Sequence, residues 1–284
     1  SGEDAQSYLQ GQLSIDLVSM EPYDIRFGLR LNKKGKTQAG MYVIKSDEET
    51  FSLLSRGTSG LDLIALMEEN IVADDIEFCD QSTEYDLVTV YGPNAEEIFK
   101  ILNLTCPPEK KVSQNEEITA FLDSRLKNKT YTLLVPKKNT ILENVHISFT
   151  DQSEIEDARI RSGLVAIPNE IGPDELPQEG GLEKECVDFQ KGCYLGQEVM
   201  ARIHAMGKVR RQTLPVEFES STPPILPTPI FHDQKKVGLL KSFIKGVHGY
   251  VGIAIIHENG INALREGKIK MQGNTAKFKL YEPK

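Results

Sequence analysis

The last third of the chain narrows the possible folds most, because it reads as a series of short strands separated by turn residues. From Arg211 onward, the segments RQTLPVEFES, TPIFHD, KKVGLLKSFI, YVGIAIIHE, KIKMQG and TAKFKLYE combine strand-like lengths with branched or aromatic side chains. Short strands at even spacing are typical of a barrel that closes on itself. The sequence therefore predicts a small β-barrel at the C-terminus, over residues 206–284.

The first half of the chain mixes strands and helices. Residues 23–44 alternate apolar and polar side chains around a turn at Asn32–Gly35, which predicts two strands, and ETFSLLS predicts a third. The segment SGLDLIALMEENI has helical spacing, with Thr58 or Ser59 placed to cap it. Residues 85–136 then read as strand, helix, strand and strand, which is half of a ferredoxin-like sandwich. We therefore expect an α+β fold.

A long irregular segment, LVAIPNEIGPDELPQEGGLEKE, follows a helix that we expect over residues 155–163. Long loops in compact proteins are usually either functional or disordered. This one leads straight into FQKGCYLGQEVMARIHAMGKVRR, residues 189–211, where chemically reactive residues gather. Its position favours a functional loop.

Charge and composition disfavour several classes of function. The chain has 33 Lys and Arg residues against 42 Asp and Glu residues, and the net charge of −9 argues against stable nucleic-acid binding. Neither a membrane-spanning apolar run nor a signal-peptide pattern occurs, so we expect a soluble, intracellular protein. The histidines lack metal-ligand spacing, and P-loop and GxGxxG fingerprints are missing from the sequence. We expect neither a metal site nor a nucleotide cofactor.

The region near residue 208 is basic, although the net charge of the chain is negative. Lys208, Arg210 and Arg211, with Arg202 shortly before them, form a basic cluster that suits an anionic small molecule or a phosphate patch. The alternative is a solvated rim of surface charges.

The chain has four cysteines, Cys79, Cys106, Cys186 and Cys193, and none of them is in CxxC spacing. This pattern indicates neither a disulfide scaffold nor a zinc site, and it fits a reducing compartment.

Cys193 stands out because of its neighbours. Lys191 supplies a positive charge, and a helix that starts near Gly196 would add its positive end, both of which lower the pKa of a thiol. Gly192 and Gly196 leave little bulk to cover the sulfur. His204 on the same expected helix is a candidate base for the thiol. The alternative is a small buried cysteine that packs a turn.

The residues around Cys193 also resemble those of a known family. KGCYLGQE, followed by Arg202 and GKVRR, resembles the signature of the YgfZ-type folate-binding proteins, which are relatives of the glycine cleavage system T protein, an aminomethyltransferase. GEDAQSYLQGQLSIDL resembles the opening helix of that family, LNKKGK its first hairpin, and RIRSGLVAIPNEIG its approach to the cysteine. The resemblance covers nearly the whole chain in the same order.

The resemblance implies an α+β, three-part ring like the aminomethyltransferase fold. Residues 1–84 and 151–205 would form a discontinuous folate-binding core, residues 85–150 a ferredoxin-like unit, and residues 206–284 the barrel. It further implies a tetrahydrofolate-binding accessory protein that supports the assembly, maintenance or repair of iron-sulfur proteins, including those in tRNA modification. Its partners would be a reduced folate and iron-sulfur client or assembly proteins. A membrane would not be among its partners. The compartment would be the bacterial cytoplasm or the mitochondrial matrix.

The same resemblance assigns roles to single residues. Cys193 would be the functional, catalytic thiol. Glu179 would hold the pterin ring, since a carboxylate can accept two hydrogen bonds from its N–H edge. Arg202 or the GKVRR cations would attract the folate tail. The other expected cofactor-binding residues are Lys191, Gly192, Tyr194, Gly196, Gln197 and Glu198.

One departure from the T protein affects the mechanism. Ala39 and Gly40 stand where the aminomethyltransferases carry an acid–base aspartate, and neither can move a proton. We therefore expect folate binding without the aminomethyl-transfer reaction. Two alternatives stay open: a folate-dependent one-carbon transferase or demethylase with another carboxylate, such as Asp16, as its base, or a non-catalytic interaction scaffold.

Overall fold

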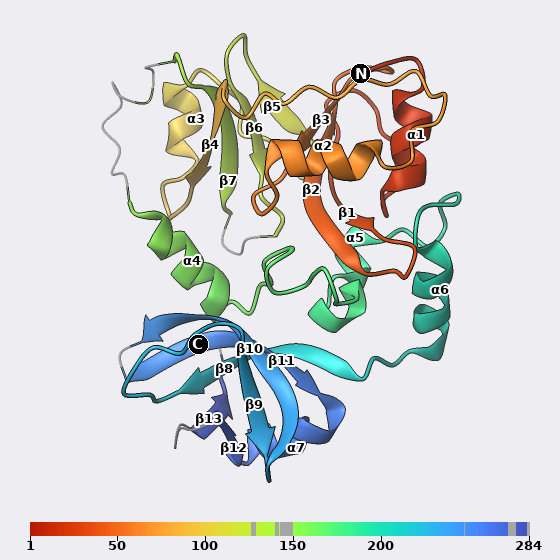
Figure 1. The fold of residues 1–284 in the computed structure, drawn as a ribbon. Helices are drawn as coiled ribbons and strands as arrows, with labels where there is room; N and C mark the ends of the chain where they lie inside the picture. Colours follow the sequence, from red (N-terminus) through yellow and green to blue (C-terminus); the bar gives the residue numbers. More distant parts are fainter. Residues whose placement is uncertain (126–128, 140–141, 143–149, 247, 272–276, 283–284) are drawn as a thin grey trace. The chain divides into compact units, whose positions relative to one another are not determined.

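The structure, a computed structural model, describes residues 1–125, 129–139, 142, 150–246, 248–271 and 277–282. The chain divides into two compact units (Figure 1). Unit 1 comprises Ser1–Lys33, Ala39–Phe149 and Glu185–Gln197, and unit 2 comprises Lys34–Gln38, Thr150–Lys184 and Glu198–Lys284. The three-part division expected from the sequence stays a prediction. Of its second part, residues 85–150, residues 140–141 and 143–149 are among those outside the described residues.

Unit 1 begins with a helix and a three-stranded sheet of order β1-β2-β3. Its elements are α1 (Ala5–Gln12), β1 (Ile25–Leu31), β2 (Thr37–Lys45), β3 (Phe51–Leu54) and α2 (Gly60–Glu68). The predicted strands and the helix are confirmed, and Ser59 rather than Thr58 caps α2, where its side chain accepts a hydrogen bond from the Asp62 amide at 3.2 Å. Gly35 takes φ +70° in the turn between β1 and β2, as the turn residues predicted.

Strand β2 separates two apolar clusters of unit 1. Met41 and Val43 pack with residues of α1 and α2, whereas Tyr42 and Ile44 pack with Phe121 of the next sheet. Successive side chains of a strand point to opposite faces, so the apolar run from Met41 to Ile44 can serve both clusters. This accounts for the burial of β2 along its length.

The second sheet of unit 1 has the antiparallel order β4-β7-β6-β5. Its elements are β4 (Tyr85–Val90), α3 (Glu97–Ile101), β5 (Val112–Gln114), β6 (Thr119–Leu122) and β7 (Tyr131–Pro136). Ile98 and Phe99 of α3 pack with Leu133 of β7 in a shared apolar core. The predicted strand, helix, strand and strand are all present. Sequence reasoning missed β5, because three residues are too short to show an alternation.

Unit 2 contains the predicted barrel, which closes in the order β10-β11-β8-β13-β12-β9. The strands are β8 (Arg211–Phe218), β9 (Thr228–His232), β10 (Lys235–Gly246), β11 (Gly249–His257), β12 (Ile269–Met271) and β13 (Lys277–Leu280). Its interior includes Phe218 stacked on Phe278, with ring centroids 4.7 Å apart. All six predicted strands are confirmed.

Short helices complete the chain. They are α4 (Gln152–Arg161), the 3-10 helix η2 (Pro177–Gly180), α5 (Glu183–Cys186), α6 (Gln197–Met206) and α7 (Glu258–Arg265). The expected helix at residues 155–163 is α4, which Asp151 caps through a 2.8 Å bond from the Ser153 amide. Helix α7 was not predicted, because it is short, contains Gly260 and follows β11 without a break. None of the described helices is both long and apolar enough to cross a membrane.

Candidate functional site

The segment that carries Cys193 lies against the C-terminal end of α1, within unit 1. The Asp188 amide donates to the carbonyl of Ser14 at 2.8 Å, and the Leu195 amide donates to the carbonyl of Gly11 at 3.0 Å. The Ser14 hydroxyl donates in turn to the carbonyl of Cys186. These backbone contacts join parts of the chain more than 170 residues apart and fix both ends of the cysteine segment.

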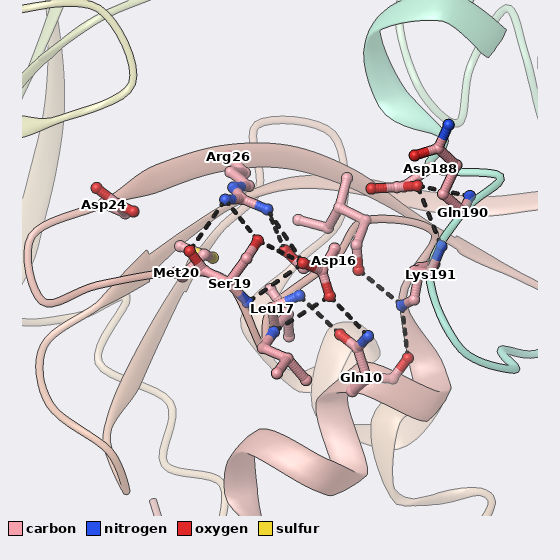
Figure 2. A network of polar contacts seen from close by, with 12 residues as sticks. Gln10, Asp16, Leu17, Ser19, Met20, Asp24, Arg26, Asp188, Gln190 and Lys191 are labelled. Carbon is pink, nitrogen blue, oxygen red and sulfur yellow. Dashed lines mark hydrogen bonds and ion pairs between the residues drawn. The ribbon is translucent and has the colours of Figure 1, made fainter.

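Lys191 is the central contact of this segment, and only 8% of it is exposed. Its Nζ donates to the carbonyl of Gln10 at 2.6 Å (Figure 2). It also donates to the carbonyls of Leu13 at 2.7 Å and Ile15 at 2.6 Å. An ammonium group has three N–H donors, so all three are used. Burial lowers the pKa of Lys191 to about 8, although Asp16 and Asp188 favour its charged form.

Two further groups shape the loop around Lys191. The Asp188 carboxylate accepts from the amides of Gln190 at 2.8 Å and Lys191 at 3.2 Å, which closes a tight turn. The buried ring of Tyr194 lies 5.1 Å from the Lys191 Nζ, within the range of a cation–π contact. Lys191 and Tyr194 are therefore both occupied in holding the segment, and their expected roles in cofactor binding stay predictions.

Cys193 itself is exposed, as are Cys79 and Cys106, whereas Cys186 is buried. Burial raises the pKa of the Cys186 thiol to about 12, so it stays protonated at neutral pH. Cys106 donates a hydrogen bond to the Tyr131 hydroxyl at 3.2 Å. Within the described part of the chain, we find no hydrogen bond or ion pair to the Cys193 sulfur.

The two glycines beside Cys193 differ in what they do. A side chain built on Gly192 would meet nothing within 4 Å, so Gly192 is not required by close packing. Gly196 has φ +84°, a left-handed conformation that L residues with side chains rarely adopt. Helix α6 begins at the next residue, and the Gln197 amide donates to the Tyr194 carbonyl at 3.1 Å. The predicted helix start near Gly196 is confirmed.

Asp16 is a poor candidate for the base of a transferase. Its carboxylate accepts from the Gln10 side chain at 2.9 Å and from the amide and hydroxyl of Ser19 (Figure 2). It also accepts from the Val18 amide at 3.3 Å. Burial opposes ionisation of Asp16, but these hydrogen bonds outweigh burial and hold its pKa below the ordinary value. A carboxylate stabilised in its charged form takes up a proton less readily.

Glu179, the expected pterin ligand, belongs to unit 2 and is 6% exposed. Its two oxygens accept from Arg211, with distances of 2.7 Å to Nε and 2.8 Å to Nη2. One of these oxygens also accepts from the Leu176 amide at 2.8 Å, which anchors Glu179 to the start of η2. This bidentate pair raises the pKa of Arg211, although partial burial opposes the rise.

A second buried carboxylate completes this charge cluster. Glu175 lies 3.7 Å from Arg211 and 3.3 Å from the Nζ of Lys241 on β10. It also accepts from the Gly172 amide at 3.2 Å. The two carboxylates, Glu175 and Glu179, are therefore matched by two cations, Arg211 and Lys241.

Beside this cluster, unit 2 has a pocket of about 370 Å³. It is lined by Lys36, Leu176, Glu179, Ile203, Lys208, Val209, Arg210, Arg211 and His257. The basic cluster predicted from the sequence thus contributes three cations, and Lys36 and His257 join it from distant parts of the chain. Because Glu179 and Arg211 are paired, the charge of the lining is positive.

The remaining expected residues lie outside the pocket lining. Gln197 is half-buried at the start of α6, and Glu198 and Arg202 are exposed on that helix. The Nδ1 of His204 is in hydrogen-bond contact with the Glu183 carboxylate, so one ring nitrogen is engaged there. Ala39 is fully buried in the apolar core of unit 1, where it cannot meet a ligand.

Comparison with known proteins finds a family match for the N-terminal part of the chain and similarity to two kinds of named proteins. Residues 1–116 match the family described as the GCVT N-terminal domain. An iron-sulfur cluster assembly factor IBA57 homolog, mitochondrial, from Aspergillus fumigatus is 25% identical over 159 residues, which are 51% of this chain and 35% of that protein. The tRNA-modifying protein YgfZ of Edwardsiella ictaluri is 26% identical over 74% of this chain and 65% of its own length. The chain therefore spans between about a third and two thirds of these relatives.

The fold is shared with a solved structure. The glycine cleavage system aminomethyltransferase T from Bartonella henselae matches with a TM-score of 0.79 and 14% identity, covering 99% of this chain and 81% of that one. At this identity the likeness establishes the fold, an α+β GcvT-like fold with a closed C-terminal barrel, and the expected fold class is confirmed. The resemblance to this family is confirmed as well, because residues 1–116 match the GCVT N-terminal domain and the chain is similar to proteins named YgfZ and IBA57.

Proposed function

We propose that this protein binds a reduced folate in unit 2 and supports the assembly, maintenance or repair of iron-sulfur proteins, with Cys193 as its functional thiol. The observation that carries the folate proposal is the pocket beside Glu179, with its excess of cations. The iron-sulfur role is supported by the relatives named as an iron-sulfur cluster assembly factor and a tRNA-modifying protein.

The pocket suits the anionic end of a folate. A tetrahydrofolate with one glutamate carries two carboxylates at neutral pH, and every further glutamate adds one. Lys208 and Arg210 lie in the lining, and both are exposed, so their charges are available to a ligand. A volume of about 370 Å³ lies within the range of small-molecule sites.

Glu179 has two possible roles in such a site. It either accepts hydrogen bonds from the pterin edge, or it holds Arg211 in place for an anion. We expect Glu179→Gln to weaken tetrahydrofolate binding by about 1 to 3 kcal/mol in both cases. Titration with 6-methyltetrahydropterin, which lacks the glutamate, separates the two roles. If Glu179 binds the pterin, Glu179→Gln also binds this fragment more weakly than the wild type does. If Glu179 only positions Arg211, the affinity falls for the full cofactor alone.

A one-carbon transferase is less well supported. Asp16 is stabilised as the carboxylate and is therefore a weak base, and Ala39 in the apolar core has no group that can take up a proton. We expect no methylene-tetrahydrofolate from a glycine-derived lipoyl substrate. Steady turnover of one-carbon groups on the folate would contradict this and favour the transferase.

The role of Cys193 is tested in cells that lack the corresponding natural gene. We expect a Cys193→Ser copy to leave iron-sulfur enzyme activity low, and a Cys106→Ser copy to restore it, because both thiols are exposed but only Cys193 lies in the anchored segment. Equal protein levels and equal melting temperatures are the controls. Full activity with Cys193→Ser would leave a scaffold as the better interpretation.

A further inference from the structure

The cysteine segment completes the C-terminal end of α1. The last carbonyls of a helix have no partners within the helix, and they need donors from elsewhere. The carbonyl of Gln10 accepts from the Lys191 ammonium at 2.6 Å, and the carbonyl of Gly11 accepts from the Leu195 amide at 3.0 Å. Lys191 therefore satisfies the end of a helix that lies far from it in the sequence.

The same ammonium also holds the chain that leaves α1. The carbonyls of Leu13 and Ile15 accept from its Nζ at 2.7 Å and 2.6 Å. Three carbonyls from one short stretch thus converge on one cation, close to the negative end of the helix dipole. Such a cage matches the three donors of an ammonium, whereas the flat, five-donor guanidinium of an arginine does not fit it.

This geometry leaves no N–H of Lys191 for the thiol. Hydrogen bonding from a lysine is one way to favour a thiolate, but here every donor ends on a backbone carbonyl. The charges that face the ammonium are those of Asp16 and Asp188, and the ring of Tyr194 covers it at 5.1 Å. The positive charge is therefore directed toward α1.

We propose that Lys191 is a positioning residue, whose ammonium fastens the Cys193 segment to the end of α1 instead of activating the thiol. The inference rests on the proposed role of Cys193 for its functional meaning. The attachment itself can be tested without folate or an iron-sulfur client. If Cys193→Ser restored activity in cells, the proposed function would fail while the attachment could still be demonstrated.

The test compares the full-length wild type with Lys191→Met and a matched control, Lys45→Met. Lys45 is also a buried lysine of unit 1, and its Nζ is held by Gln6 at 3.1 Å, the Met20 carbonyl at 3.0 Å and Glu48 at 2.9 Å. We expect Lys191→Met to speed hydrogen exchange of the Leu195 amide about tenfold. The control variant should leave that amide unchanged.

The alkylation rate of Cys193 against pH separates positioning from activation. If Lys191 positions the segment, Lys191→Met changes the limiting alkylation rate of Cys193 at high pH and does not change the apparent pKa of its thiol. With activation, the apparent pKa rises by about half a unit or more, and exchange at Leu195 is unchanged. The second pattern, or no change in either measurement, overturns the inference.

A rescue experiment covers the case in which Lys191→Met does not fold. Lys191→Ala leaves the carbonyl cage without its cation, and added n-propylammonium can supply both the charge and the three donors. We expect propylammonium to restore slow exchange at Leu195, and tetramethylammonium, which has the charge but no N–H, to have no effect. Equal effects of the two cations, or none from either, would contradict a carbonyl-held ammonium.

Discussion

Lys191 in unit 1 and Glu179 in unit 2 are both buried, charged residues of the motifs, but their partners differ. Lys191 is held by three backbone carbonyls, whereas Glu179 is held by the side chain of Arg211. The first arrangement depends on one cation. The second depends on an ion pair, and removing either member leaves the charge of the other without its partner. The comparison shows that a charged residue in a motif can serve the fold, while exposed neighbours such as Cys193 and Lys208 remain free to meet a ligand.

The largest effect is expected from breaking the charge pair of unit 2. Arg211→Met leaves the buried carboxylate of Glu179 without its cation, while Glu175 keeps Lys241, and removing one partner of a buried pair is costly. Because Arg211 is partly exposed, we expect a loss of about 2 to 4 kcal/mol in the free energy of unfolding. Urea denaturation of the variant and of the double variant Arg211→Met/Glu179→Gln checks this.

The double variant is the control for that prediction. Glu179→Gln removes the charge that Arg211→Met leaves unpaired, so it should recover part of the loss. If the double variant is no more stable than Arg211→Met alone, the pair does not act as a unit and the contrast with Lys191 is weakened.

An intermediate effect is expected at the glycines beside Cys193. Gly196→Ala must place a side chain at φ +84°, which costs about 1 to 2 kcal/mol. Gly192→Ala meets open space and should change stability by less than about 0.5 kcal/mol. Chemical denaturation of both variants compares them directly, and equal losses would show that the segment is not held in the conformation described.

The smallest effect concerns Asp16, one of the charges that face Lys191. Its pKa is lowered from 3.8 in the folded protein, so its contribution to stability is present above that value and is lost as the pH falls through the lower pKa of the folded carboxyl. We expect the stability difference between the wild type and Asp16→Asn to be constant above about pH 5 and to shrink by about 0.5 kcal/mol below pH 4. Urea midpoints of both proteins at several pH values measure this difference. A stability difference that grows as the pH falls would contradict the expected direction.

Sequence patterns predicted most of the fold, because alternation and helical spacing are local. The six barrel strands, α2, α4 and the start of α6 all carried such patterns, whereas β5 and α7 were too short or too interrupted to do so. The spacing of Lys191, Cys193 and Gly196 indicated a candidate segment; the helix start beside it is confirmed, and its function stays a prediction.

The partners of the site residues were not predictable in the same way. Glu179 and Arg211 lie 32 residues apart, and Lys191 reaches carbonyls about 180 residues away, contacts that only the folded chain creates. The basic run near residue 208 gave a signal for the pocket, but Lys36 and His257 carried none, because they lie far from that run in the sequence and only the fold brings them to it.

The most direct test of the central claim is a calorimetric titration of tetrahydrofolate triglutamate into the wild type and into Lys208→Gln, with Lys235→Gln as a control, since Lys235 is exposed and is not part of the pocket lining. We expect one molecule to bind per chain, with affinity lowered about threefold to tenfold by Lys208→Gln and by added salt, and unchanged in the control. No heat with the wild type, or equal affinity in all three proteins, would contradict a folate site in the basic pocket of unit 2.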